Sequence, residues 1–235
     1  HPRAELADLP RIGGTKNPDI AAIGALAPDL VFANQEENTP AAVQALEAAG
    51  IAVHLRFPKT VADALSMLNE IAEIYESGSA SRRVPQLAAE IEQARTWLPE
   101  ESFSLFVPIW EDRSGGTPWW MTFNQDTFTH DLLAQAGFAN VFAQRERRYP
   151  LAADLGAATA VDAAGRDTRY PRVTRAEIQA AAPDLILLPS EPYAYSHADV
   201  ERIATTLAAT PAAANGRILP IDGSLLTWPG TRMGQ

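Results

Sequence analysis

Apolar residues in the first quarter of the chain follow two patterns, one of helical spacing and one of short unbroken runs. Residues 19–26 predict a short helix, and residues 30–33 predict a strand. Thr39 is a suitable N-cap with proline directly after it, and Gly50 is a suitable C-cap, so a second helix is expected between them. Residues 51–57 predict a second strand. This alternation of helix and strand implies parallel pairing.

An internal repeat is the most informative feature of the sequence. Ala-Pro-Asp-Leu-Val-Phe-Ala-Asn at residues 27–34 returns as Ala-Pro-Asp-Leu-Ile-Leu-Leu-Pro at residues 182–189, and an amphipathic run precedes each copy. Proline stops a helix, and an unbroken apolar run is typical of a strand buried on both faces of a parallel sheet. The repeat therefore predicts two similar lobes with a ligand held between them.

The stretch between the two copies is almost purely helical. Residues 61–75 are interpreted as a packed helix of the first lobe, and residues 81–98 as a helix connecting the lobes, although an ordinary packed helix remains an alternative. The expected fold is α/β, with two lobes, parallel-rich sheets and a long joining helix. The predicted boundaries are 1–58 for the N-terminal lobe, 59–102 for the helical segment and 103–235 for the C-terminal lobe.

The second lobe is predicted from shorter patterns. A glycine- and proline-containing stretch, residues 110–120, is expected to be a loop, and Asp126 is expected to begin a helix. The other expected elements are strand 104–109, helix 126–136, strand-like 140–142, helix 174–181, strand 185–188, helix 198–207 and strand 217–221.

Composition narrows the possible functions. The chain has 235 residues, of which 46% are hydrophobic and 20% charged, as in a folded globular protein. Acidic residues outnumber basic ones by 29 to 19, which argues against nucleic-acid binding. Arg145, Arg147 and Arg148 form the densest basic patch and are interpreted as a solvated loop. Cysteine is absent, which excludes disulfides and thiolate metal sites, and no apolar run is long enough to span a membrane.

Enzyme motifs are missing from the sequence. There is no nucleophile elbow, phosphate loop, dinucleotide-binding glycine motif or zinc-protease motif. Asp126 and His130 have the i,i+4 spacing of metal ligands, but a helix cap and a surface or packing histidine explain them more simply. A direct metal-ion binder and a metal-dependent enzyme stay open as less favoured alternatives, as does an interaction module. The residues that could then converge on a metal are His54, His130, His197, Glu191 and Asp222.

Several motifs together resemble a known family. They occupy residues 13–19, both Pro-Asp-Leu strands, 49–53, the long helix, 121–128, 131–137 with 140–142, and 217–220. In their order and spacing over almost the whole chain, they resemble the helical-backbone, class III substrate-binding proteins of ABC importers. That family captures vitamin B12, iron-siderophores or haem outside the cytoplasmic membrane.

The resemblance implies a binding protein and not an enzyme. It implies a monomer with no intrinsic cofactor, which works with ABC permease subunits in the periplasm or outside the cell and is associated with the membrane. No signal or lipid-anchor segment is visible in the sequence. Family members usually begin with a further strand, helix and strand, and end with a helix after the position of Met233. The first lobe is therefore expected to be incomplete, either because the sequence is a fragment or because the lobe is completed in another way.

Ligand contacts are expected from loops that follow strands, where open α/β sheets place their ligands. Aromatic residues cluster in these loops of the second lobe, and cobalamin is the favoured ligand, ahead of an iron-siderophore and haem. Tyr170 stands where B12 binders of the family carry an aromatic residue, whereas Asn34 stands where they can carry tryptophan. The expected ligand-binding residues are Asn34, Gln35, Phe57, Trp110, Trp119, Trp120, Tyr170, Tyr193 and Trp228.

Acidic residues on each lobe are candidates for contact with the permease. In the family, one glutamate per lobe meets arginines of the permease. The positions nearest to that role are Glu36 or Glu37 in the first lobe and Glu177 in the second, with Glu191 a weaker candidate. The alternative is an ordinary solvated carboxylate near a helix start, where the helix dipole favours negative charge.

Overall fold

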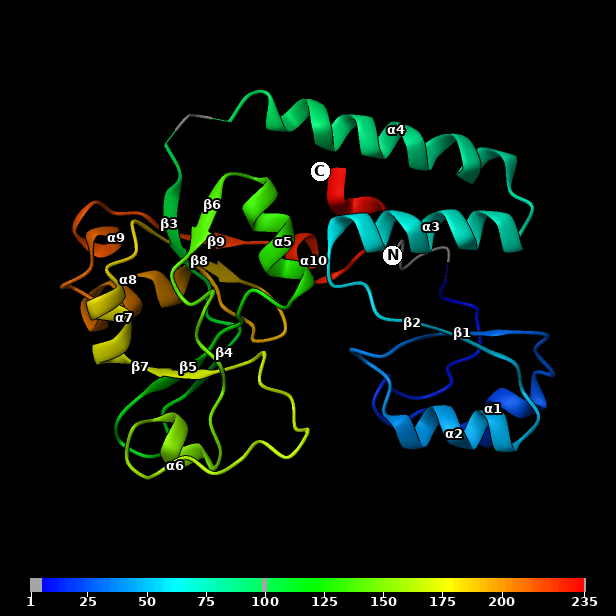
Figure 1. The fold of residues 1–235 in the computed structure, drawn as a ribbon, viewed down its shortest axis with the longest axis horizontal. Helices are drawn as coiled ribbons and strands as arrows, with labels where there is room; N and C mark the ends of the chain where they lie inside the picture. The colour runs from blue at the N-terminus through cyan, green and yellow to red at the C-terminus, as the bar shows by residue number, and fades with distance from the viewer. Residues whose placement is uncertain (1–5, 99–100, 235) are drawn as a thin grey trace. The chain divides into compact units, whose positions relative to one another are not determined.

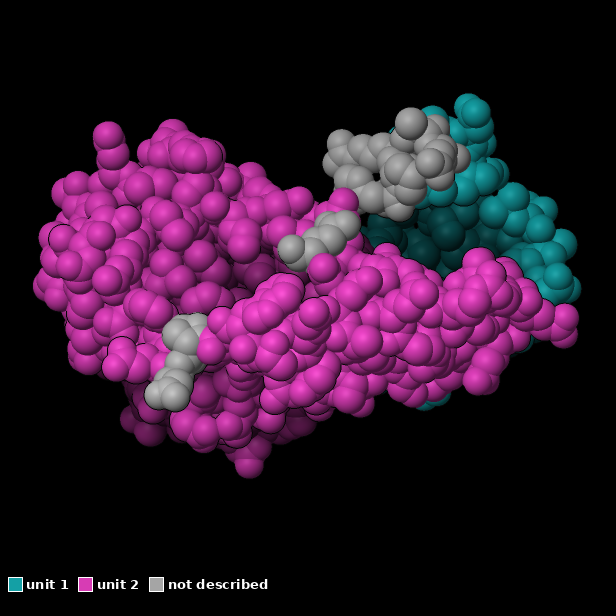
Figure 2. All heavy atoms as spheres, turned by 90° about the horizontal axis from the view of Figure 1, so that it is seen from above, with its two compact units in different colours: residues 1–57 teal, residues 58–235 magenta. Residues whose placement is uncertain are grey.

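The computed structural model describes residues 6–98 and 101–234. The chain divides into two compact units, His1–Phe57 and Pro58–Gln235 (Figures 1 and 2). Both units are α/β, as the sequence predicts. The strands of the two Pro-Asp-Leu repeats belong to different sheets.

The first unit has the predicted order of helix and strand. Its elements are α1 (Ile20–Ala25), β1 (Val31–Asn34), α2 (Pro40–Ala48) and β2 (Val53–Arg56). The two strands pair in parallel, from Val31 opposite Val53 to Asn34 opposite Arg56. The expected N-cap is confirmed, since Thr39 Oγ1 accepts a hydrogen bond from the Ala42 amide at 3.2 Å.

The two copies of the sequence repeat share a backbone conformation as well as a sequence. Ala27 and Ala182, the alanines that precede the two Pro-Asp-Leu sequences, have φ angles of 46° and 47°. Left-handed backbone is uncommon for any residue except glycine. Both copies therefore end a helix with the same turn before their strand begins.

The second unit is built on a four-stranded parallel sheet of order β6-β3-β8-β9. Its strands are β3 (Phe103–Phe106), β6 (Phe138–Asn140), β8 (Leu185–Pro189) and β9 (Ile218–Ile221). Its helices are α3 (Val61–Ile74), α4 (Gly78–Arg95), α5 (Phe128–Gln135), α6 (Leu151–Asp154), α7 (Arg175–Ala181), α8 (His197–Thr206), α9 (Pro211–Ala214), α10 (Ser224–Thr227) and the 3-10 helix Thr231–Gly234.

Both faces of this sheet are buried. Phe106, Ile186 and Leu188 belong to one core cluster, whereas Leu105 and Leu187 belong to another. Alternate residues of β3 and β8 thus face different cores, and this explains why their sequences are apolar without alternation.

Helices α3 and α4 lie side by side within the second unit (Figure 1). The amide of Val61, the first residue of α3, donates to Asp131 Oδ2 of α5 at 2.7 Å. Asp63 completes a capping box with Thr60 at the same helix start. The contacts of α3 thus join it to α4 and α5, whereas the sequence pattern placed it with the first lobe.

The predicted loop at residues 110–120 is wrong. Strands β4 (Trp110–Asp112) and β5 (Trp119–Met121) form an antiparallel hairpin there, and β5 also pairs with β7 (Arg172–Thr174). The glycine and proline residues occupy only the turn between the strands. The expected N-cap at Asp126 is also wrong, because Thr127 caps α5 by accepting from the His130 amide.

Candidate functional site

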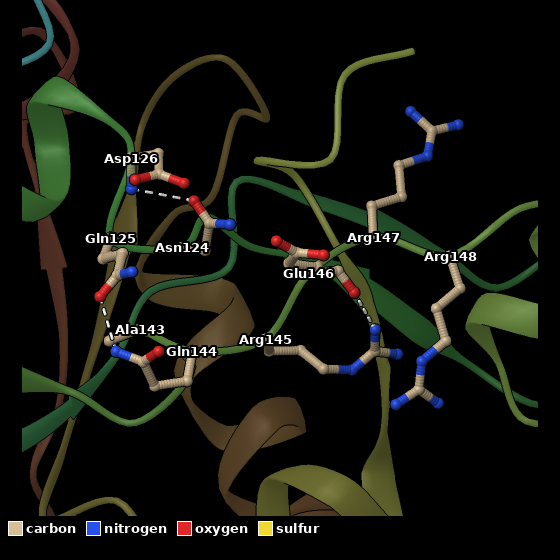
Figure 3. A pocket seen from close by; sticks show the side chains of 9 residues that line it. All are labelled: Asn124, Gln125, Asp126, Ala143, Gln144, Arg145, Glu146, Arg147 and Arg148. Atoms are coloured by element: carbon tan, nitrogen blue, oxygen red, sulfur yellow. Dashed lines mark hydrogen bonds between the residues drawn. The ribbon is translucent and has the colours of Figure 1, made fainter. Parts of the chain in front are cut away.

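A cavity of about 320 Å³ opens in the second unit (Figure 3). One wall follows the carboxyl end of β6, and the other lies between β5 and α5. In open α/β sheets, ligands bind beyond the carboxyl ends of the strands. The residues that line it are Asn124, Gln125, Asp126, Ala143, Gln144, Arg145, Glu146, Arg147 and Arg148.

Hydrogen bonds join the two walls. Gln144 Nε2 donates to Gln125 Oε1 at 2.6 Å, and the Gln125 amide donates to the Ala143 carbonyl at 2.9 Å. The buried Asn124 accepts from the Asp126 amide through Oδ1 at 3.0 Å. The cavity is therefore an ordered feature of the second unit.

Arg147 is held against an aromatic ring. Its guanidinium carbon lies 4.3 Å from the centre of the Tyr149 ring, and that of Arg166 lies 3.9 Å from the same centre. Tyr149 is buried, and its hydroxyl donates to the Asp167 carbonyl at 2.7 Å. The Arg147 amide also donates to the Thr168 carbonyl at 2.8 Å. Packing and hydrogen bonds thus place this cation at the cavity.

Arg145 is largely buried, with only 13% of its side chain exposed, and its guanidinium contacts several other residues. Its Nη1 lies 3.0 Å from Asp154 Oδ1, and its Nε donates to Glu177 Oε1 at 3.2 Å. Nη2 donates to the carbonyls of Asp154 and Arg172 at 2.7 and 3.3 Å. The interpretation of this basic stretch as a solvated loop is therefore wrong for Arg145.

Three arginines and two carboxylates line the cavity: Arg145, Arg147 and Arg148, with Asp126 and Glu146. Arg148 is exposed, and within the described residues its guanidinium makes no hydrogen bond or ion pair. Burial lowers the pKa of Arg172, and the charge of Arg147 lowers it further. Burial alone would raise the pKa of Asp167, but its bonds to Arg169 and the charge of Arg147 outweigh burial and lower it. The exposed guanidinium of Arg148 can donate hydrogen bonds to an anionic group at the cavity.

The predicted aromatic residues of the second lobe lie in different surroundings. Trp120 is fully buried in the core, which is a correction to its expected place on a ligand wall. Trp110 is 44% exposed and packs edge-to-face on Tyr193, with ring centres 5.6 Å apart. Trp119 and Tyr170 are half-buried. Trp228 is 50% exposed, and its Nε1 donates to Glu191 Oε1 at 2.5 Å.

The predicted polar residues of the first unit are engaged locally. Asn34 Oδ1 accepts from the Glu36 amide at 2.8 Å, and Gln35 is exposed at the end of β1. Phe57 is half-buried at the end of this unit. Glu37 Oε2 accepts from Thr15 Oγ1 at 3.0 Å and lies 4.0 Å from Lys16 Nζ.

None of the predicted ligand-binding residues lines the cavity. The sequence signal that could have revealed it is the basic stretch directly after a predicted strand. Among the possible metal ligands, His130 is half-buried, and burial lowers its pKa, so the imidazole is neutral at pH 7. Residues 6–98 and 101–234 contain no group of three or more histidine, aspartate or glutamate side chains placed to hold a metal ion.

The family model for periplasmic binding proteins matches residues 1–225. The chain belongs to this family. Its members are extracytoplasmic substrate-binding proteins of ABC importers and not enzymes, so this periplasmic binding protein has a small-molecule ligand and a permease partner. The comparison with curated protein sequences gave no match. No helix in the part of the chain that the structure describes has the length and apolarity needed to cross a membrane.

Solved structures share the fold of this periplasmic binding protein. The haem-binding protein RhuT from Roseiflexus sp. RS-1 has a TM-score of 0.75 at 20% identity, covering 100% of this chain and 82% of RhuT. The vitamin B12-binding protein BtuF of Vibrio cholerae has a TM-score of 0.72 at 16% identity, with coverage of 99% and 79%. The haem-binding protein HutB of Vibrio cholerae has a TM-score of 0.71 at 20% identity, with coverage of 98% and 83%.

Proposed function

We propose that this binding protein captures a metal chelate that carries anionic groups, and that the arginine-lined cavity binds those groups. The observation that supports this most directly is the pair Arg147 and Arg148, one held on Tyr149 and the other exposed at the same cavity. Arginine binds carboxylate and phosphate oxygens through charge-assisted hydrogen bonds. A ferric siderophore, haem or cobalamin can each supply such an oxygen.

The cavity lining shifts the preference among these ligands from cobalamin to a ferric siderophore with carboxylate or catecholate oxygens. A corrinoid needs a wide apolar wall, but the cavity is lined by polar and charged residues, and Trp120 lies in the core. Haem, as bound by RhuT and HutB, is the second candidate, and vitamin B12, as bound by BtuF, is the third. The further proposed contacts are the partly exposed Asn34, Gln35, Phe57, Trp110, Trp119, Tyr170, Tyr193 and Trp228.

Substitution of Arg147 or Arg148 by alanine should weaken anionic-chelate binding. Each lost charge-assisted hydrogen bond costs about 1.5–3 kcal/mol, which is about ten- to two-hundredfold in affinity. Titrations of ferric citrate, a ferric tricatecholate siderophore, haemin and cyanocobalamin, followed by tryptophan fluorescence and calorimetry, measure the change.

Arg83→Ala is the matched control, because Arg83 pairs with Glu90 on the surface of α4. This variant should bind like the original protein. Tight binding of cyanocobalamin that is indifferent to both cavity arginines, with no binding of the anionic chelates, would contradict the proposal and restore the corrinoid.

We also propose that the protein acts as a monomer at the membrane and that Glu36, Glu37 and Glu177 are its permease contacts. Glu37 supports this best, because 39% of its side chain is exposed and its carboxylate contacts the surface residues Thr15 and Lys16. Glu177 has 35% of its side chain exposed, and its two carboxylate oxygens also accept hydrogen bonds from Arg145 and Thr174. Carboxylates at such positions can meet arginines of a partner.

Reversal of the charge at Glu37, by Glu37→Lys, should lower ligand uptake about tenfold, because it places like charges together at the interface. Ligand affinity should stay within about twofold, since an exposed surface charge contributes little beyond its own contacts. Uptake into proteoliposomes that contain the permease tests this. Glu47→Lys, which reverses an exposed charge on α2 of the same unit, is the control. Equal uptake by the two variants would remove Glu37 from the docking surface.

A further inference from the structure

The two carboxylate oxygens of Glu177 accept hydrogen bonds from different parts of the second unit. Oε2 accepts from the Thr174 amide at 2.9 Å and completes the capping box at the start of α7. Oε1 accepts from Arg145 Nε at 3.2 Å. One side chain therefore connects a helix start with the largely buried Arg145 beside the cavity.

Arg145 and Arg148 share a second carboxylate. Asp154 is fully buried, and its Oδ1 lies 3.0 Å from Arg145 Nη1 and 2.9 Å from the Arg148 amide, from which it accepts. Its Oδ2 accepts from the Arg172 amide at 2.8 Å. The backbone at Arg148 is thus fixed by the same carboxylate that helps to neutralise Arg145.

The arrangement balances charge in a place that water reaches poorly. A buried guanidinium is stable only when anionic or carbonyl oxygens meet its donors. If Glu177 no longer faced Arg145, one carboxylate, that of Asp154, would remain for that guanidinium. A closer ion pair between Arg145 and Asp154 would then compete with the hydrogen bond from the Arg148 amide to the same carboxylate.

We propose that Glu177 is a positioning residue for the ligand-binding cavity. Through Arg145 it fixes the segment 143–148 and thereby presents Arg147 and Arg148 to the anionic groups of the ligand. The expected effect of Glu177 on ligand affinity rests on the proposed function. The expected effect of Glu177 on the structure of segment 143–148 is independent of the proposed function. The contact between Glu177 and Arg145 thus links the start of α7 to the cavity lining.

Two substitutions separate this role from helix capping. Glu177→Gln can keep an oxygen at the capping site, but its amide group then faces the Arg145 donor. Glu177→Asp keeps the charge and can still cap, because Asp63 and Asp199 occupy the same position in the capping boxes of α3 and α8. Its side chain is one methylene shorter and loses the contact with Arg145.

Hydrogen exchange read by mass spectrometry on the whole protein tests the proposal without a ligand. In the original protein, hydrogen bonds protect the amides of Arg147 and Arg148 from exchange. In both variants these two amides should exchange about tenfold faster. Helix α7 should stay protected in Glu177→Asp. Affinity for ferric citrate should fall about tenfold in both variants. Asp63→Asn removes the equivalent capping carboxylate from α3 and should change neither measurement at residues 143–148.

A capping role alone predicts a different result. Glu177→Asp would then behave like the original protein, and any faster exchange in Glu177→Gln would be confined to α7. Unchanged exchange at residues 143–148 in both variants would overturn the proposal. Faster exchange there with no binding of any anionic chelate, even by the original protein, would instead reject the proposed ligand and leave the positioning role standing.

Discussion

Replacement of Arg202 by alanine should lower the free energy of unfolding by about 3–5 kcal/mol. The side chain of Glu111 is completely buried, and Arg202 meets it with two hydrogen bonds, Nη1 to Oε1 at 2.5 Å and Nη2 to Oε2 at 2.9 Å. The substitution leaves that carboxylate buried without its main partner. Desolvation would lower the pKa of Arg202, but the hydrogen bonds to Glu111 and Asp199 raise it above the usual arginine value.

Arg113→Ala provides the comparison on the same carboxylate. Arg113 Nε lies 3.8 Å from Glu111 Oε1, but 57% of its side chain is exposed, so its loss should cost less than about 1 kcal/mol. Urea unfolding followed by circular dichroism measures both variants. Equal stability of the two would show that burial of the Glu111 charge does not set the cost.

Trp120→Ala should lower the free energy of unfolding by about 3–5 kcal/mol. The side chain is fully buried in a core cluster with Phe106, Val173 and Ile178. Within the described residues its Nε1 has no hydrogen-bond partner, so packing is its main contribution. Truncation would leave a large cavity between the antiparallel sheet and the parallel one.

Trp120→Phe is the matched control, because it keeps most of the buried volume and removes an unpaired donor. It should cost less than about 1.5 kcal/mol. Denaturant unfolding gives both values, and chelate titration of the Phe variant gives the second comparison. Affinity for ferric citrate, haemin or cyanocobalamin should be unchanged in Trp120→Phe. A selective loss of binding with normal stability would return Trp120 to a ligand wall.

Much of the local structure could be predicted from the sequence, because it depends on neighbouring residues. Thr39 caps the helix it was expected to cap, since an N-cap needs only its own side chain and the amide of the first helical turn. Each Pro-Asp-Leu sequence leads from a helix stop into a strand, β1 in the first unit and β8 in the second. The order of such motifs along the chain was also enough to indicate the periplasmic binding protein family, which the family model confirms.

Tertiary structure decided which side chains meet. Trp119 and Trp120 are adjacent in sequence, yet only the pairing of β5 with β4 and β7 determines that Trp120 faces the core. The basic stretch looked solvated because Asp154 and Glu177, which neutralise Arg145, lie 9 and 32 positions away. A charge is buried only where folding brings oppositely charged partners close to it. The number of residues between two side chains in the sequence does not determine their distance in the folded protein. The sequence therefore determined the elements of the first unit and the family, whereas the fold determined the β4–β5 hairpin, the cavity and the charges that surround it.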